Sequence, residues 1–205
     1  YAAGVSNSVE RNSKKFSEEL IRFKNFCKLN HKKIVYISTY SIFDNSRNKN
    51  QYSKNKVKIE KIIKKNISNY LILRLPEIVG FNKNPNTLTN FFYRKIKNKK
   101  TFCVWKNAKR NLLDVDDAIK ICIYFVKMYK KEKKILNILN KKFYKPLELV
   151  QSFEKILKIK SNYKVLKTKK INWKVKNSVN SKIIKKLKLK FNNEYLNKTL
   201  KKYYK

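Results

Sequence analysis

Tyr52 and Lys56 are two residues whose types and spacing could carry acid–base chemistry. A separation of four residues places both side chains on one face of a helix. A lysine ammonium near a phenol favours the phenolate and lowers a tyrosine pKa that is otherwise about 10. Such a tyrosine can act as a general acid or base near neutral pH. Lysine is so frequent in this chain that the spacing alone is expected by chance, so the pair is informative only through the elements around it.

Alternating helices and strands surround the pair and must position it. The apolar patterns predict helix 9–30, strand 34–37, helix 53–65 and strand 70–75. The first strand ends in Ser38 and Thr39, and Pro76 stops the second. Helix, strand, helix, strand is the order of a parallel sheet with crossover helices. The same sheet is therefore expected to hold both the hydroxyl residues and the helix of Tyr52.

Further elements follow in the second half of the chain. The patterns predict helices over 87–98, 116–129, 146–159 and 193–204, and strands over 101–105 and 133–140. Thr87 is expected to cap its helix. The strand at 133–140 is a third candidate for the main sheet.

The glycines and the acidic residues are scarce, so their placement carries information. Gly4 and Gly80 both lie where a strand meets a loop, and glycine is kept where the backbone passes close to a ligand or takes a positive φ. Three of the 13 acidic residues cluster at Asp114, Asp116 and Asp117, before a predicted helix. We interpret Asp116 or Asp117 as a helix N-cap.

The composition limits the class of partner. A formal net charge of +40 points to a polyanion, but all but six of the 53 basic residues are lysine, whereas base recognition favours arginine. Lysine also occurs together with Asn, Ile, Tyr and Phe, whose codons are rich in A and T, so we prefer solvated lysine faces to a nucleic-acid partner. Three cysteines without a CxxC pair and one histidine argue against disulfides and a metal. We expect no membrane span, no signal peptide and a cytoplasmic location.

Five motifs in order resemble one family. They are YAAG at 1–4, VYIST at 35–39, YSKNK at 52–56, LRLPEIVG at 73–80 and RNLLDVDDAI at 110–119. Together they resemble the extended short-chain dehydrogenase/reductase family, which includes nucleotide-sugar epimerases, dehydratases and reductases. The resemblance covers about residues 1–160. It implies an α/β fold: the C-terminal part of a Rossmann-type doubly wound parallel sheet, with a small mixed α/β substrate-binding region.

The resemblance also implies a division of the chain. Residues 1–80 would form the second half of an NAD(P)-binding Rossmann domain, and residues 81–205 would mainly bind substrate, with 111–140 returning to the Rossmann sheet. NAD or NADP would be the cofactor and a nucleotide sugar the substrate, which suits the synthesis of surface polysaccharide.

Individual roles follow from the resemblance. Tyr52 would be the catalytic acid/base, Lys56 would lower its pKa and hold the nicotinamide ribose, and Thr39 would bond the substrate oxygen. The implied cofactor contacts are Ala2, Ala3, Gly4, Ser38, Lys56, Leu75 and Pro76. The implied substrate contacts are Thr39, Glu77 and Arg110. For Arg110 a surface pair with Asp114 or Asp116 remains an equal alternative.

The chain departs from the family pattern in ways that affect activity. The family opens with a strand, GxxGxxG and a helix that hold the pyrophosphate, and YAAG falls at the end of its fourth strand. We therefore expect a C-terminal fragment with an incomplete cofactor cleft. The loop from Thr39 to Tyr52 is shorter than usual. Tyr40-Ser41 stands where the dehydratases carry an acidic pair, which favours epimerisation or reduction over dehydration.

Alternative interpretations stay open at this point. The chain could be a truncated paralogue that has lost catalysis or, less favoured, a basic nucleic-acid-binding protein. Family members often dimerise through the helices that match 9–30 and 53–65. Phe16, Phe23, Ile59 and Ile63 could supply such contacts in a homodimer, although we prefer that they pack on the sheet.

Overall fold

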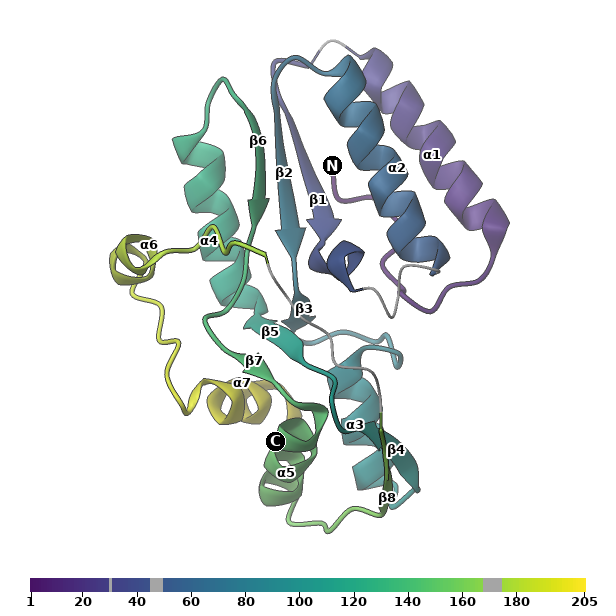
Figure 1. Ribbon diagram of the computed structural model, residues 1–205, viewed down its shortest axis with the longest axis vertical. Helices are drawn as coiled ribbons and strands as arrows, with labels where there is room; N and C mark the ends of the chain where they lie inside the picture. The colour runs from purple at the N-terminus through teal and green to yellow at the C-terminus, as the bar shows by residue number, and fades with distance from the viewer. Residues whose placement is uncertain (30, 45–49, 168–174) are drawn as a thin grey trace. The chain divides into compact units, whose positions relative to one another are not determined.

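The computed structural model describes residues 1–29, 31–44, 50–167 and 175–205, which fall into two units (Figure 1). Of the described residues, the first unit contains 1–75, 119–138 and 175–178, and the second contains 76–118, 139–167 and 179–205. Helix α4 (Val115–Met128) contributes to both units, because the division falls after Ala118.

A three-stranded parallel sheet forms the centre of the first unit. Its strands are β1 (Ile34–Thr39), β2 (Tyr70–Leu75) and β6 (Lys133–Asn137), in the order β1-β2-β6. Parallel strands are covered on both faces, which suits the apolar runs in β1 and β2. The backbone of Tyr1 lies along the other edge of β1, where Ile37 N donates to Tyr1 O at 3.2 Å. The three strands predicted for this sheet are therefore confirmed.

Two helices lie side by side against this sheet: α1 (Ser13–Lys28) and α2 (Gln51–Asn66) (Figure 1). Both begin at an asparagine cap, which satisfies a free backbone N–H group. Asn12 Oδ1 accepts from Lys14 N at 3.0 Å, and Asn50 Oδ1 accepts from Tyr52 N at 2.7 Å. The first helix therefore begins later than the predicted residue 9, and the second begins early enough to include Tyr52.

The helices and the sheet share one apolar core. Its buried residues are Phe23, Tyr36, Ile59, Ile63, Tyr70 and Ile72. Burying one large apolar side chain contributes about 1.5–3 kcal/mol. Phe16, Phe23, Ile59 and Ile63 are each at most 1% exposed. These four residues pack within the chain, which confirms the alternative that we preferred over dimer contacts.

The second unit contains a three-stranded and a two-stranded sheet in its described residues. The strands are β3 (Glu77–Val79), β5 (Arg110–Asp114) and β7 (Phe143–Tyr144), and β4 (Phe102–Trp105) with β8 (Tyr163–Leu166). Strand β3 is parallel to β5, and β7 is antiparallel to it. Residues 111–140 are predicted to return to the main sheet. Strand β6 does lie in that sheet, whereas β5 pairs with strands of the second unit.

The second unit also contains the helices α3 (Leu88–Lys97), α5 (Pro146–Leu157), α6 (Ser181–Lys186) and α7 (Tyr195–Tyr204). Helices α3, α5 and α7 contribute Phe92, Phe153 and Leu200 to its buried core. Thr87 caps α3 as predicted, with Oγ1 accepting from Asn90 N at 3.4 Å. In the described part of the chain, no helix is long and apolar enough to cross a membrane.

Candidate active site

Tyr52 and Lys56 share one face of α2, as their spacing predicts. The Lys56 side chain is only 7% exposed. Its Nζ lies 5.6 Å from the centre of the Tyr52 ring, which is within the range of a cation–π interaction. The fold therefore places a buried positive charge beside the ring of the predicted acid/base.

A buried carboxylate that the sequence interpretation missed completes the surroundings of Lys56. Glu19 of α1 is 1% exposed, and its Oε1 accepts a hydrogen bond from Lys56 Nζ at 3.3 Å. Its Oε2 accepts from Asn55 Nδ2 at 2.8 Å. Burial lowers the pKa of Lys56, and the charge of Glu19 opposes that change. Glu19 lies between Phe16 and Phe23 on the buried side of α1. An acidic residue on the apolar face of a predicted helix is the signal in the sequence that could have identified it.

Gly4 passes directly against this ion pair. A Cβ at Gly4 would lie 2.3 Å from Glu19 Oε1 and 2.8 Å from Lys56 Nζ, closer than atoms can approach. The groups that the backbone approaches at this glycine are charged side chains. Neither Gly4 nor Gly80 has a positive φ, so that alternative is wrong, and the ligand contact of Gly4 stays a prediction. Ala2 and Ala3, next to it, are exposed.

Gly80 also marks a close approach, in the second unit. A Cβ there would lie 2.8 Å from Val115 Cγ1. The second glycine therefore makes room for the first residue of α4.

Ser38 donates a hydrogen bond to a second buried carboxylate. Its Oγ lies 2.6 Å from Glu60 Oε1, and Arg74 Nη2 donates to Glu60 Oε2 at 2.6 Å. The guanidinium of Arg74 lies 5.0 Å from the centre of the Phe43 ring. This network joins β1, α2 and β2 near the carboxyl ends of the two strands. The cofactor contact predicted for Ser38 stays a prediction.

Thr39 is held at the carboxyl end of β1 by a short 3₁₀ turn (Tyr40–Phe43). Its Oγ1 accepts from Ser41 N at 3.1 Å and lies 2.8 Å from Ser41 Oγ. Thr39 is in register with Leu75 of β2, which is half-buried. Ligands of parallel α/β sheets bind at the carboxyl ends of the strands, where these two residues lie.

Buried polar atoms without hydrogen-bond partners occur on β1 and on α2, the helix of Lys56. Within the described residues, the Tyr36 hydroxyl, Ser53 Oγ and Asn55 Oδ1 are buried and form no hydrogen bond. Lys56 Nζ lies 5.5 Å from the centre of the Tyr36 ring. Unsatisfied buried groups cost stability and are uncommon outside functional sites. Their gathering at this place supports a functional site.

The remaining predicted contacts belong to the second unit. Pro76 and Glu77 are half-buried where β3 begins. Arg110 is 4% exposed at the start of β5, and its Nη1 donates to Lys109 O at 3.0 Å. Burial contradicts a surface position for Arg110, and its pairing with Asp114 or Asp116 stays a prediction. The substrate contacts of Glu77 and Arg110 stay predictions.

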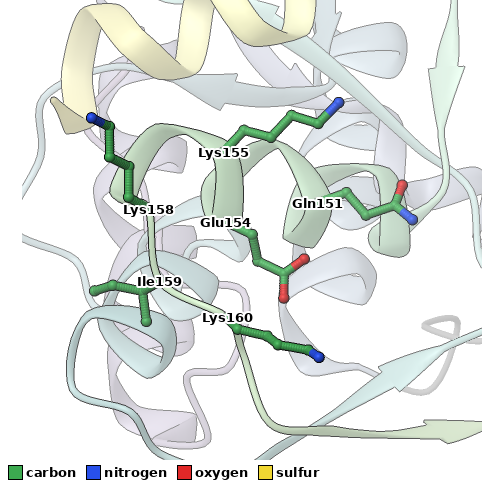
Figure 2. A pocket seen from close by; sticks show the side chains of 6 residues that line it. All are labelled: Gln151, Glu154, Lys155, Lys158, Ile159 and Lys160. Atoms are coloured by element: carbon green, nitrogen blue, oxygen red, sulfur yellow. The ribbon is translucent and has the colours of Figure 1, made fainter.

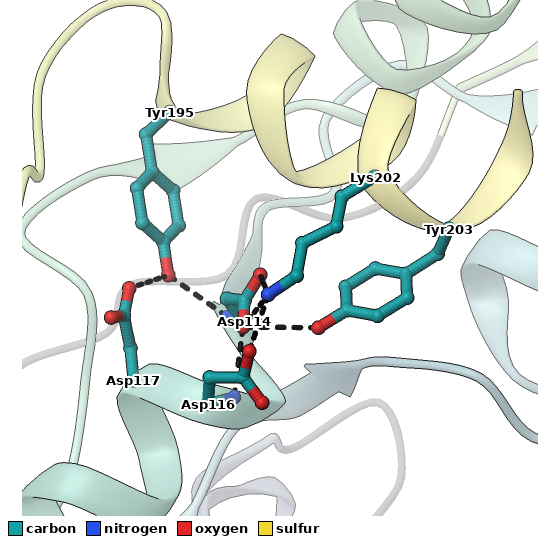
Figure 3. A network of polar contacts seen from close by, with 6 residues as sticks. All are labelled: Asp114, Asp116, Asp117, Tyr195, Lys202 and Tyr203. Carbon is teal, nitrogen blue, oxygen red and sulfur yellow. Dashed lines mark hydrogen bonds and ion pairs between the residues drawn. The ribbon is translucent and has the colours of Figure 1, made fainter.

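The acidic cluster caps one helix and anchors another (Figure 3). Asp114 Oδ1 accepts from Asp116 N at 2.8 Å, so Asp114 is the cap of α4, and not Asp116 or Asp117 as predicted. Asp116 and Asp117 lie in the first turn of α4, where negative charge is favourable.

The C-terminal helix binds to this cluster. Tyr195 donates to Asp117 Oδ2 at 2.9 Å and accepts from Asp114 N at the same distance. Lys202 Nζ donates to Asp114 Oδ2 at 3.2 Å and to Asp116 Oδ2 at 2.5 Å (Figure 3). Burial opposes the charge on Lys202, but these hydrogen bonds outweigh it and raise its pKa. The geometry explains the cluster as an anchor for α7.

A separate hollow of about 530 Å³ lies at the end of α5 (Figure 2). It is lined by Gln151, Glu154, Lys155, Lys158, Ile159 and Lys160. Glu154 Oε1 accepts from Ser161 N at 2.8 Å and from Ser161 Oγ at 2.6 Å. The hollow is lined by none of the predicted catalytic residues. Among the described residues, no group of three or more His, Cys, Asp or Glu side chains could hold a metal ion.

Comparisons with known proteins identify the chain's relatives. The model of the NAD dependent epimerase/dehydratase family matches residues 19–138. None of the curated proteins compared with the chain matches it. The solved structures to which it is similar include a UDP-glucuronic acid 4-epimerase from Bacillus cereus in complex with UDP-glucuronic acid and NAD. That structure is 18% identical with a TM-score of 0.73, over 98% of this chain and 71% of that one.

Two further solved structures have the same fold. A UDP-N-acetylglucosamine 4-epimerase from Bacillus cereus is 20% identical, with a TM-score of 0.65 over 98% of this chain and 75% of that one. The UDP-Glc/GlcNAc 4-epimerase from Campylobacter jejuni is 14% identical, with a TM-score of 0.71 over 100% of this chain and 74% of that one. These likenesses confirm the predicted α/β fold with its Rossmann-type parallel sheet.

Proposed function

Because this chain belongs to the NAD dependent epimerase/dehydratase family, we propose that it acts as an NAD(P)-dependent epimerase or reductase on a nucleotide sugar. The observation that carries the proposal is the buried ammonium of Lys56 beside the ring of Tyr52, 5.6 Å from its centre. Both residues lie within the matched range 19–138. The solved neighbours support the substrate class, since the proteins named are UDP-sugar 4-epimerases.

The N–H donors of Lys56 suit the binding of a nicotinamide dinucleotide. An ammonium carries three N–H donors, and the bond to Glu19 uses one of them, so Lys56 could also donate to ribose hydroxyls. The exposed backbone at Ala2 and Ala3 could approach the same cofactor. When bound, the dinucleotide would accept a hydride from a sugar carbon and return it. NAD and NADP remain alternatives.

The protein's own residues would move the proton. Tyr52, as phenolate, accepts the proton of the sugar hydroxyl while the carbon that bears the hydroxyl loses its hydride, and the Lys56 charge favours that phenolate. Thr39 Oγ1, at the carboxyl end of β1, would bond the same sugar oxygen. In the return step the carbon regains a hydride and its oxygen takes the proton back from Tyr52. Return to the opposite face of the sugar gives the epimer.

The test compares Tyr52→Phe and Lys56→Ala with the unchanged chain, each expressed with any coding sequence that lies upstream of Tyr1. We expect Tyr52→Phe to lower turnover of UDP-sugars by at least about 100-fold, because general acid–base catalysis contributes that much. Product formation is followed by NMR of the sugar. Equal turnover in all three proteins would overturn the assignment.

Lys97→Ala is the matched control for Lys56→Ala. Lys97 stands four residues after Tyr93 on α3, and its Nζ lies 5.4 Å from the centre of that ring. It repeats the spacing and the ring contact outside the proposed site, so its loss should leave turnover unchanged.

The net charge of +40 favours nucleic-acid binding as a second candidate. That function predicts an affinity for DNA that falls steeply with salt. Failure to retain DNA even at low salt, together with nicotinamide cofactor binding, would exclude it. Cofactor and sugar binding without turnover would instead indicate a paralogue that has lost catalysis.

A further inference from the structure

We propose that Glu19 is a positioning residue of this site: its buried carboxylate holds the Lys56 ammonium beside Tyr52 and sets the pH range over which Tyr52 can work. The role of Tyr52 in this inference rests on the proposed function. The hold on Lys56 rests on the geometry alone, and can be tested without turnover.

The contacts of Glu19 fix its position. Oε1 accepts from Lys56 Nζ at 3.3 Å and Oε2 accepts from Asn55 Nδ2 at 2.8 Å, so each carboxylate oxygen is directed toward α2. Gly4 covers the pair, since a Cβ there would overlap Glu19 Oε1. With Glu19 only 1% exposed, water cannot take its place beside Lys56. The ammonium is therefore held by one charged partner and has little freedom to move.

The charge of Glu19 acts directly on Lys56, to which it is hydrogen-bonded, and through Lys56 on Tyr52. A buried lysine tends to lose its proton, and a carboxylate at hydrogen-bond distance counteracts that tendency. The same carboxylate partly cancels the positive field that Lys56 exerts on Tyr52. Glu19 therefore extends the pH range in which Lys56 is charged, and it weakens the preference of Tyr52 for the phenolate.

The other ionisable groups around Lys56 do not duplicate this role. Tyr36 of β1 faces the ammonium, and burial raises its pKa, so it is neutral where an enzyme works. The pKa of Tyr1 is also raised, chiefly by burial. Glu60 of α2 is bound by Ser38 and Arg74. Within the described part of the chain, Glu19 is therefore the carboxylate that is paired with Lys56.

The experiment removes the charge of Glu19 and keeps its shape. Glu19→Gln is compared with Glu18→Gln, whose carboxylate is one residue away on the exposed side of α1. The ionisation of Tyr52 is followed by NMR of isotope-labelled tyrosine, with Tyr52→Phe identifying its resonance. The pH profile of turnover is measured on the same proteins.

We expect Glu19→Gln to move the Tyr52 titration to lower pH by about one unit or more, because a nearby negative charge is lost. The alkaline limb of the pH profile should also move to lower pH, because Lys56 then gives up its proton more readily. Glu18→Gln should change neither. A Tyr52 titration that does not move in Glu19→Gln would overturn the proposal, whatever the turnover.

Glu19→Asp keeps the proposal testable if Glu19→Gln fails to fold, as judged by circular dichroism. It retains the charge but withdraws the carboxylate by one methylene. The Tyr52 titration should then stay close to that of the unchanged chain while turnover falls, because the ammonium is displaced. A Glu19→Asp titration shifted by a unit or more would contradict the role of charge. Turnover missing in the unchanged chain, with the Glu19→Gln shift of Tyr52 present, would contradict only the proposed function.

Discussion

The chain carries two tyrosine–lysine pairs with the same spacing and nearly the same ring contact, but in different surroundings. Lys56 Nζ lies 5.6 Å from the centre of the Tyr52 ring, and Lys97 Nζ lies 5.4 Å from that of Tyr93. Lys97 is exposed and donates to the Tyr93 hydroxyl at 3.1 Å. Lys56 is buried and bound to Glu19.

The difference shows that the spacing determines whether the lysine contacts the ring. Burial determines how strongly the lysine charge acts on the tyrosine. Water screens the charge of Lys97, so an exposed pair of this kind contributes little. At Lys56 screening is weak, so the ammonium acts strongly on its neighbours, and the carboxylate of Glu19 opposes the loss of its proton.

The sharpest way to break this comparison is Glu19→Ala. It leaves Lys56 buried without its partner, which should lower the free energy of unfolding by about 3–5 kcal/mol. Urea denaturation followed by fluorescence measures the change. The double variant Glu19→Gln/Lys56→Met should regain most of that stability, because no buried charge is left unpaired. A double variant as unstable as Glu19→Ala would contradict this account.

Gly4→Ala tests the packing around the same pair. Its Cβ would overlap Glu19 Oε1 and Lys56 Nζ, so the ion pair or the N-terminal segment must shift. Overpacking of this kind costs about 1–3 kcal/mol, measured as a lower midpoint of thermal unfolding. Gly80→Ala, which meets Val115, gives a comparison outside the site. Unchanged stability in Gly4→Ala would show that the segment before α1 packs differently.

The pH dependence of stability sharpens the comparison further. The pKa of Lys56 is lowered in the folded chain from the ordinary lysine value of 10.5. Between the lowered pKa and 10.5 the unfolded chain binds more protons than the folded one, so this lysine makes stability rise with pH in that window. The free energy of unfolding of the unchanged chain, minus that of Glu19→Gln/Lys56→Met, should therefore increase as the pH rises through this window. A decrease in this stability difference with rising pH would contradict the lowered pKa of Lys56.

Lys97→Ala should have the smallest effect. Exposed ion and hydrogen-bond partners on a helix contribute about 0–1 kcal/mol, and less at high salt. Chemical denaturation at low and high salt checks this. A loss as large as that of Glu19→Ala would remove the distinction between the two pairs.

The sequence by itself determined the parts that depend on local pattern. The apolar runs of β1 and β2, the Thr87 cap and the four-residue spacing of Tyr52 and Lys56 each depend on neighbours along the chain, and all are found in the fold. The order of the five motifs sufficed for the family, which the match to residues 19–138 then showed.

Only the tertiary structure decided which groups meet across the chain. Glu19 reaches Lys56 from a different helix, and Gly4 reaches both from a third segment, so no spacing predicts their contact. Strands β3 and β7, with three and two residues, are too short for a period to show. Asp114 is distinguished from Asp116 as the cap by the exact start of α4. The preference for helix, strand or cap depends on neighbouring residues, whereas burial and long-range pairing exist only once the chain has folded.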